Sequence, residues 1–150
     1  MLGGSLTIEF MGNTMATVTD STLEKMVLRA KEISKRAYCP YSKFPVGAVV
    51  LANTGDLFEG CNVENASYGL TICAERNAIF HMAAMGQLKI AAVVIYTPTP
   101  KPSAPCGACR QVINEFGPDA VVMSVCDASD VLKKSLSVLL PDAFGPGNLH

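Results

Sequence analysis

The sequence has no excess of charge of either sign. Its 150 residues contain 12 Lys and Arg against 13 Asp and Glu, for a formal net charge of -1 at pH 7. A protein that follows a nucleic-acid backbone normally has a basic face, because cations must meet the phosphates. Hydrophobic residues make up 49% and charged residues 17%, which is typical of a globular chain. We therefore expect a free small molecule as the partner, and no nucleic-acid polymer.

Long apolar runs are also lacking. The longest, residues 90–96, is far shorter than the roughly 20 residues that cross a bilayer. The N-terminus has neither the basic start nor the long apolar core of a secretory signal. These features predict a cytoplasmic protein with no membrane partner. In that compartment the six cysteines are expected to stay thiols.

The chain shows no internal repeat and no linker, so its length suits one domain. Residues 1–20 lack helical or strand periodicity and are interpreted as a flexible N-terminal extension or a cloning remnant. Residues 21–150 are then the folded domain. Ser21, with Glu24 three residues later, matches a capping box and predicts that the first helix begins at Ser21.

Strands and helices alternate along the rest of the domain. Apolar runs predict strands at 46–52, 57–61, 90–96 and 121–126, with helices from 71 or 72 to about 85 and from 106 to 116. Residues 131–136 fit a strand or a helix, and 137–140 a helical turn. This alternation predicts the α/β class, as a three-layer α-β-α sandwich around one mixed sheet of roughly five strands.

Three cysteines lie in two motifs that suit a metal. Cys106 and Cys109 form a Cys-x-x-Cys pair, and Cys73 lies in a predicted helical segment. The pair alone could be a structural zinc site or a redox dithiol. A catalytic zinc has three protein ligands and keeps its fourth position for water, whereas a structural zinc has four. No convincing fourth ligand stands near these motifs, and His81 is interpreted as an ordinary helix residue.

Glu75 follows Cys73 by two residues, a spacing that lets it act over the open position of the metal. There it could take a proton from zinc-activated water and pass it to a ring nitrogen, while hydroxide attacks an amidine-like carbon and ammonia leaves. Three thiolates oppose ionisation of that water, so their charge must be offset. Arg76 and Arg110 could donate hydrogen bonds to sulfur; a surface ion pair is the alternative for each.

The pattern of a cysteine, a following glutamate and a later Pro-Cys-x-x-Cys resembles that of the zinc-dependent nucleobase deaminases in their three-cysteine form. From about Leu23 to Gly147 the chain resembles the small homotetrameric cytidine deaminases. The motifs that carry this resemblance are CPYSKFPVGA at 39–48, GCNVENASY at 60–68, PCGACRQV at 105–112 and LLPDAFGP at 139–146.

The resemblance implies one Zn²⁺ per subunit, bound by Cys73, Cys106 and Cys109, with Glu75 as the catalytic residue. It implies hydrolysis of cytidine and 2′-deoxycytidine to the corresponding uridines and ammonia, in pyrimidine salvage. It also implies a homotetramer with shared active sites.

The same resemblance assigns roles in substrate binding. Asn62 and Glu64 are expected to hydrogen-bond the ribose 3′-hydroxyl. Phe44 is expected to pack on the pyrimidine, and the Ala74 N–H to meet the base carbonyl. The residues expected to serve a neighbouring subunit's pocket are Ala66, Tyr68 and Phe144.

Three alternatives remain open. A blasticidin-S-type deaminase would use the same zinc motif, but a ribose-reading carboxylate such as Glu64 is expected only for a nucleoside. A polynucleotide-editing deaminase would need basic surface that this chain lacks. A non-catalytic zinc-stabilised interaction domain would have a fourth ligand and would tolerate Glu75→Gln.

Overall fold

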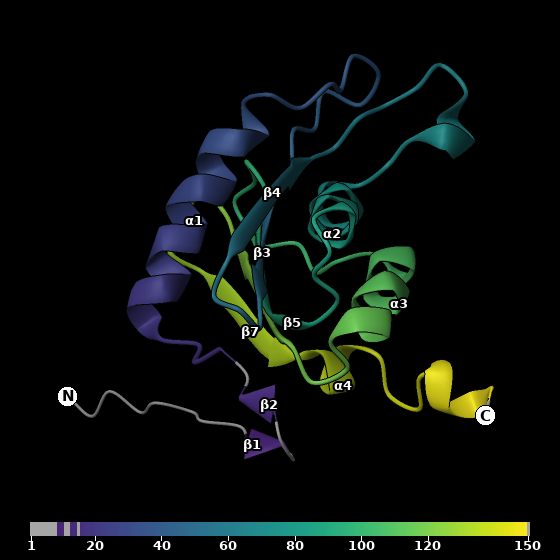
Figure 1. Ribbon diagram of the computed structural model, residues 1–150. Helices are drawn as coiled ribbons and strands as arrows, with labels where there is room; N and C mark the ends of the chain where they lie inside the picture. Colours follow the sequence, from purple (N-terminus) through teal and green to yellow (C-terminus); the bar gives the residue numbers. More distant parts are fainter. Residues whose placement is uncertain (1–8, 11–12, 15, 150) are drawn as a thin grey trace.

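The structure is a computed structural model that describes residues 9–10, 13–14 and 16–149 (Figure 1). Most of the expected extension, residues 1–20, lies outside these ranges, and its flexibility stays a prediction. The strands β1 (Glu9–Phe10) and β2 (Asn13–Thr14) pair antiparallel, which the sequence did not predict. Within the described residues, no helix combines the length and the apolar character needed to cross a membrane.

The domain is a mixed five-stranded sheet with the strand order β4-β3-β5-β6-β7. Only β5 and β6 run parallel; the other neighbours in this sheet are antiparallel. Its strands are β3 (Gly47–Ala52), β4 (Leu57–Cys61), β5 (Ile90–Tyr96), β6 (Val121–Val125) and β7 (Val131–Ser135). The expected mixed sheet is thereby confirmed, and the ambiguous segment 131–136 is mainly a strand.

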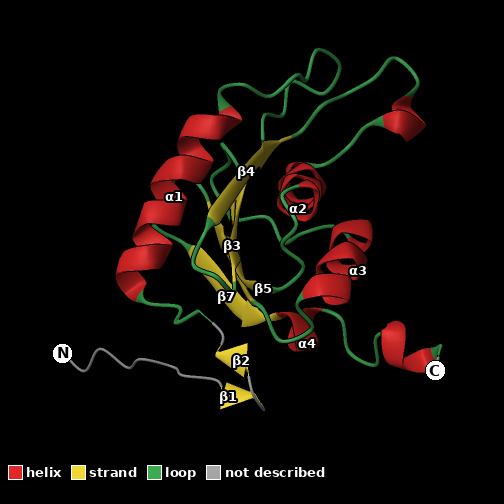
Figure 2. Cartoon of the chain, viewed as in Figure 1, coloured by secondary structure: helices red, strands yellow, loops and turns green. Residues whose placement is uncertain are grey.

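Helices cover both faces of this sheet (Figures 1 and 2). One face carries α1 (Asp20–Ser34), and the other carries α2 (Ala74–Ala84) and α3 (Gly107–Phe116). The shorter helices are α4 (Leu136–Leu139) and the 3₁₀ turns η1 (Tyr68–Leu70) and η2 (Pro146–Asn148). Every residue of β3 is buried, as expected for a central strand covered on both faces. The predicted three-layer sandwich is confirmed.

Two helices begin elsewhere than the sequence predicted. The N-cap of α1 is Thr19, whose hydroxyl oxygen accepts the Thr22 N–H at 3.1 Å, so the assignment of Ser21 as the cap is wrong. Helix α2 begins at Ala74, later than expected. The reason is that Ile72 exchanges two backbone hydrogen bonds of 3.0 Å with Val63 and is therefore extended.

Helix α2 lies directly on β4 at Gly60. A Cβ atom on Gly60 would come within 2.3 Å of the Ala78 nitrogen and 2.5 Å of the Ala74 oxygen. Both are backbone atoms of the helix, which no side-chain rotation can move away. Only glycine therefore permits this spacing between α2 and the sheet.

Gly60→Ala is expected to lower the free energy of unfolding by about 3 kcal/mol, because α2 must move off the strand. Gly69→Ala is the matched control, since a Cβ there would meet no described atom within 4 Å. Urea denaturation of the two variants and the parent tests this. Equal stability of the two variants would contradict the close approach.

Candidate metal centre

Two helix N-termini bring the three cysteines together. Cys73 is the N-cap of α2, Cys106 is the N-cap of α3, and Cys109 lies in the first turn of α3. Their sulfur atoms all lie within 4.8 Å of one another, and those of Cys73 and Cys106 are 4.0 Å apart. Soft sulfur donors at this spacing suit zinc.

The cluster is enclosed on one side only. Cys109 is buried, Cys73 is partly buried and Cys106 is exposed. Among the described residues, no histidine, carboxylate or further cysteine joins the group. Three protein ligands with one exposed member are the arrangement of a zinc site that keeps a position accessible from outside.

Hydrogen bonds within the cluster favour a thiolate. The pKa of Cys73 is lowered to about 5, chiefly by a hydrogen bond from Cys109 and, to a lesser extent, by Arg76. The Arg76 Nη2 atom donates to the Cys73 sulfur at 3.4 Å. The same contact with Cys73, together with burial, raises the pKa of Cys109. These contacts favour the thiolate form of Cys73, which is the form that binds zinc.

Glu75 is the second residue of α2 and is only 6% exposed. Burial raises the pKa of its carboxyl to about 7, and the nearby charge of Cys73 acts in the same direction. A carboxyl that titrates near neutral pH can both accept and release a proton there. Ala74 begins the same helix, so its backbone N–H has no acceptor within the helix.

Backbone pairing places residues 62–64 beside the metal cluster. Val63 pairs in parallel with Tyr38 on one side and antiparallel with Ile72 on the other. Ile72 directly precedes Cys73 in the chain. Residues from three distant parts of the sequence therefore lie in adjacent backbone segments next to the first cysteine.

The polar side chains of Asn62 and Glu64 hold the loop that carries Phe44. The Asn62 side chain accepts the Val46 N–H and donates to the Phe44 carbonyl, both at 2.8 Å. Glu64, 8% exposed, accepts hydrogen bonds from the backbone of Tyr41 and Ser42 and from the Ser42 hydroxyl. These bonds, led by that of the hydroxyl, lower the pKa of Glu64.

The remaining predicted residues lie on the surface of the single chain. Tyr68 is 74% and Phe144 60% exposed, and Ala66 is also exposed. The Phe144 carbonyl accepts hydrogen bonds from Gln111 at 2.8 Å and Asn114 at 3.2 Å. Helix α3 therefore fixes the backbone at Phe144, while its aromatic ring stays exposed.

Three residues have contacts that the sequence did not predict. Arg110 donates to the carbonyls of Pro105 and Leu139, both at 2.8 Å, so it supports the loop before Cys106 instead of a sulfur. Asn77 donates to the Cys61 carbonyl at 2.8 Å and ties α2 to the end of β4. Ser42 contacts Glu64; its only signal in the sequence was its place in the CPYSKF motif.

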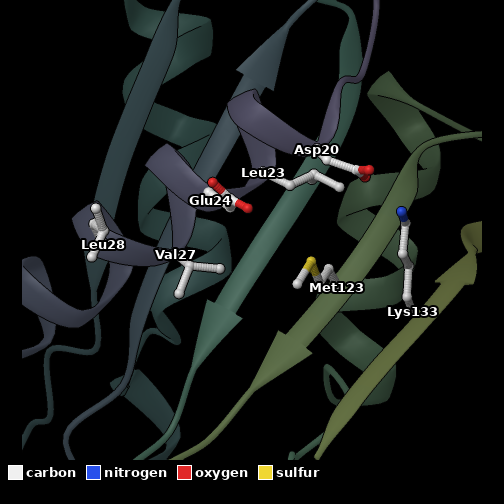
Figure 3. Close-up of a pocket in the computed structure, with 7 residues that line it drawn as sticks. All are labelled: Asp20, Leu23, Glu24, Val27, Leu28, Met123 and Lys133. Carbon is white, nitrogen blue, oxygen red and sulfur yellow. The ribbon is translucent and has the colours of Figure 1, made fainter. Parts of the chain in front are cut away.

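A groove of about 530 Å³ lies on the other side of the sheet, between α1 and strands β6 and β7 (Figure 3). Its lining residues are Asp20, Leu23, Glu24, Val27, Leu28, Met123 and Lys133. None of them belongs to the metal cluster, which lies on the face covered by α2 and α3.

A three-layer α/β fold that brings three cysteine sulfurs together at two helix N-termini is the arrangement of an α/β protein with a zinc-binding site. Residues 20–125 match the family described as the cytidine and deoxycytidylate deaminase zinc-binding region. The chain belongs to this family and is a zinc-dependent deaminase.

Individual relatives extend the match over most of the chain. A cytidine deaminase from Sporosarcina psychrophila is 41% identical over 128 residues, 85% of this chain and 94% of that protein. A crystal structure of cytidine deaminase from Burkholderia pseudomallei is 48% identical with a TM-score of 0.78, covering 81% of this chain and 98% of that one. Another from Mycobacterium tuberculosis is 37% identical with a TM-score of 0.71, covering 82% and 97%.

The raised pKa of Glu75 predicts a pH-dependent stability of the metal-free protein. Its folded pKa of about 7 lies above the ordinary value of 4.5. Ionisation of Glu75 therefore lowers the free energy of unfolding progressively between pH 4.5 and pH 7, and the whole loss is reached above pH 7. Glu75→Gln removes this charge and should stabilise metal-free protein at pH 8 by about 3 kcal/mol. The gain should vanish near pH 4.5. Urea denaturation at both pH values tests this, and a pH-independent difference would contradict it.

Proposed function

We propose that this enzyme hydrolyses cytidine and 2′-deoxycytidine to uridine and 2′-deoxyuridine, releasing ammonia, as a step of pyrimidine salvage. The observation that carries the proposal is the buried carboxyl of Glu75, with a pKa near 7, beside a three-cysteine cluster. The names of the relatives support the choice of cytidine. A cluster of three thiols also suits the reducing cytoplasm, where we place the protein.

Cys73, Cys106 and Cys109 are the residues that would bind zinc. Bound there, zinc would supply a Lewis acid that makes water a strong nucleophile at neutral pH for attack on C4 of the base. Glu75 would take one proton from the attacking water and deliver it to the ring nitrogen. It would then carry the second proton, from the new hydroxyl on C4, to the exocyclic amine, which leaves as ammonia while C4 becomes a carbonyl.

Arg76 supports this chemistry through charge. Three sulfur ligands give the site a negative charge, which opposes loss of a proton from water. The guanidinium of Arg76, which donates a hydrogen bond to Cys73, offsets part of that negative charge. The N-termini of α2 and α3 act in the same direction.

The proposed substrate contacts come from three separate segments of the chain. The free N–H of Ala74 donates to the base carbonyl, and Phe44, 37% exposed, packs against the pyrimidine. Asn62 and Glu64 bind the ribose 3′-hydroxyl. This polar pair favours a neutral sugar and would repel a phosphate, and it also distinguishes the proposal from a blasticidin-type substrate.

Glu75→Gln is expected to reduce kcat/KM for cytidine by about a thousandfold or more, because the amide cannot carry the proton. Zinc should stay near one per chain, since Glu75 is not a ligand. Ultraviolet assay of cytidine and zinc analysis on the same sample test both parts. Glu115→Gln, at an exposed position of α3, is the control. Full turnover by the Glu75→Gln variant would remove the proton shuttle and favour the non-catalytic alternative.

We further propose a homotetramer in which Ala66, Tyr68 and Phe144 complete a neighbouring subunit's site. The support is the exposed ring of Phe144 on a backbone that α3 fixes. An aromatic residue held in this way loses little entropy when it enters a partner's pocket.

Phe144→Ala should raise KM for cytidine by about tenfold and weaken assembly, because an aromatic anchor is lost from the pocket. Leu28→Ala, 70% exposed on α1, is the matched control for removal of a surface hydrophobic residue. Steady-state kinetics and light scattering measure the two effects. Parent-like KM and oligomer size in the Phe144 variant would rule out the shared pocket.

A further inference from the structure

The hydroxyl of Ser42 joins two residues that the proposed function assigns to different halves of a nucleoside. It donates to Oε1 of Glu64, and it accepts the Phe44 N–H at 3.1 Å. The backbone N–H of Ser42 also reaches Oε2 of Glu64, at 3.2 Å. One serine thus contacts both the carboxylate expected at the sugar and the backbone of the aromatic residue expected at the base.

The hydrogen-bonding capacity of Glu64 leaves room for one more donor. An ionised carboxylate has about four acceptor positions. Three are taken, by the N–H groups of Tyr41 and Ser42 and by the Ser42 hydroxyl. With both oxygens engaged, the carboxylate is held in one orientation, and a single acceptor position remains for a substrate hydroxyl.

The loop itself has a backbone conformation that needs support. Lys43, between Ser42 and Phe44, has a φ of 56°, in the left-handed region that a non-glycine residue rarely adopts. Its N–H bonds to the Cys39 carbonyl at 3.0 Å, and the contacts of Ser42 lie immediately before it. These bonds maintain the turn that presents Phe44.

We propose that Ser42 is a positioning residue that orients Glu64 toward the ribose 3′-hydroxyl and, through the Phe44 backbone, links recognition of the sugar to recognition of the base. The inference rests on the proposed function. Ser42 touches no reacting atom, so its effect falls on binding of the sugar and not on the chemical step.

The test compares cytidine with 3′-deoxycytidine, which lacks the hydroxyl in question. The parent should prefer cytidine. In Ser42→Ala the ratio of the two kcat/KM values should fall by about tenfold, since a hydrogen bond to a charged group is lost. The change should appear in KM for cytidine, with kcat within about twofold of the parent.

Three further variants sharpen the test. Ser42→Thr keeps the hydroxyl and should restore the ratio, whereas Ser42→Cys keeps the size but donates weakly and should behave as Ser42→Ala. The cysteine variant also serves if the alanine variant fails to fold. Ser21→Ala, at an exposed position of α1, is the control and should match the parent.

The outcomes separate the two proposals. A parent that does not turn over cytidine would overturn the proposed function and this inference with it. A parent that deaminates cytidine and 3′-deoxycytidine equally well would overturn the inference and the assignment of Asn62 and Glu64 to the 3′-hydroxyl, while the proposed deamination of cytidine would stand. An unchanged ratio in Ser42→Ala or Ser42→Cys, or a loss confined to kcat, would overturn the inference alone.

Discussion

The close approach of α2 to β4 at Gly60 sets the position of the helix that follows Cys73 and begins at Ala74. Because helix backbone meets strand backbone there, no side chain larger than hydrogen fits between α2 and the sheet. The hydrogen bond from Asn77 to the Cys61 carbonyl adds a second connection at the end of the same strand. The three groups to which the proposed function assigns metal binding, contact with the base and proton transfer follow one another at this helix start, as the Cys73 sulfur, the Ala74 backbone N–H and the Glu75 carboxyl.

Burial at this helix start has opposite effects on function and stability. Burial in the core raises the pKa of Glu75 toward neutral, which suits proton transfer but destabilises its ionised form. The thiolate of Cys73 reinforces that effect, and the guanidinium of Arg76 works against it. The metal-free protein therefore holds unfavourable charge near the cluster, and a bound dication would reverse the sign of the local field.

Much of this architecture could be predicted from the sequence, because hydrophobic periodicity and cysteine spacing are local signals. The layered fold and the cysteine cluster followed from them. The starts of α1 and α2 could not be predicted in this way. Thr19 and Ser21 are both residues that cap helices, and Thr19 is the cap of α1. Ile72 is extended because its backbone pairs with Val63. The sequence left Arg110 open between a hydrogen bond to sulfur and a surface ion pair, because a residue beside a ligand in sequence can point elsewhere; here it donates to the carbonyls of Pro105 and Leu139.

The contacts of Ser42 show why some long-range hydrogen bonds escape sequence reasoning. Its hydroxyl meets Glu64, 22 residues further along the chain, where Tyr38 and Ile72 pair with Val63 on opposite sides. These backbone bonds bring the loop of Phe44, the segment of Asn62 and Glu64, and the start of α2 into adjacent positions. A nucleoside bound across all three would meet its base, sugar and metal contacts on neighbouring segments of one hydrogen-bonded framework. Since backbone bonds set that register, the change of selectivity proposed for Ser42→Ala requires no movement of the cysteines.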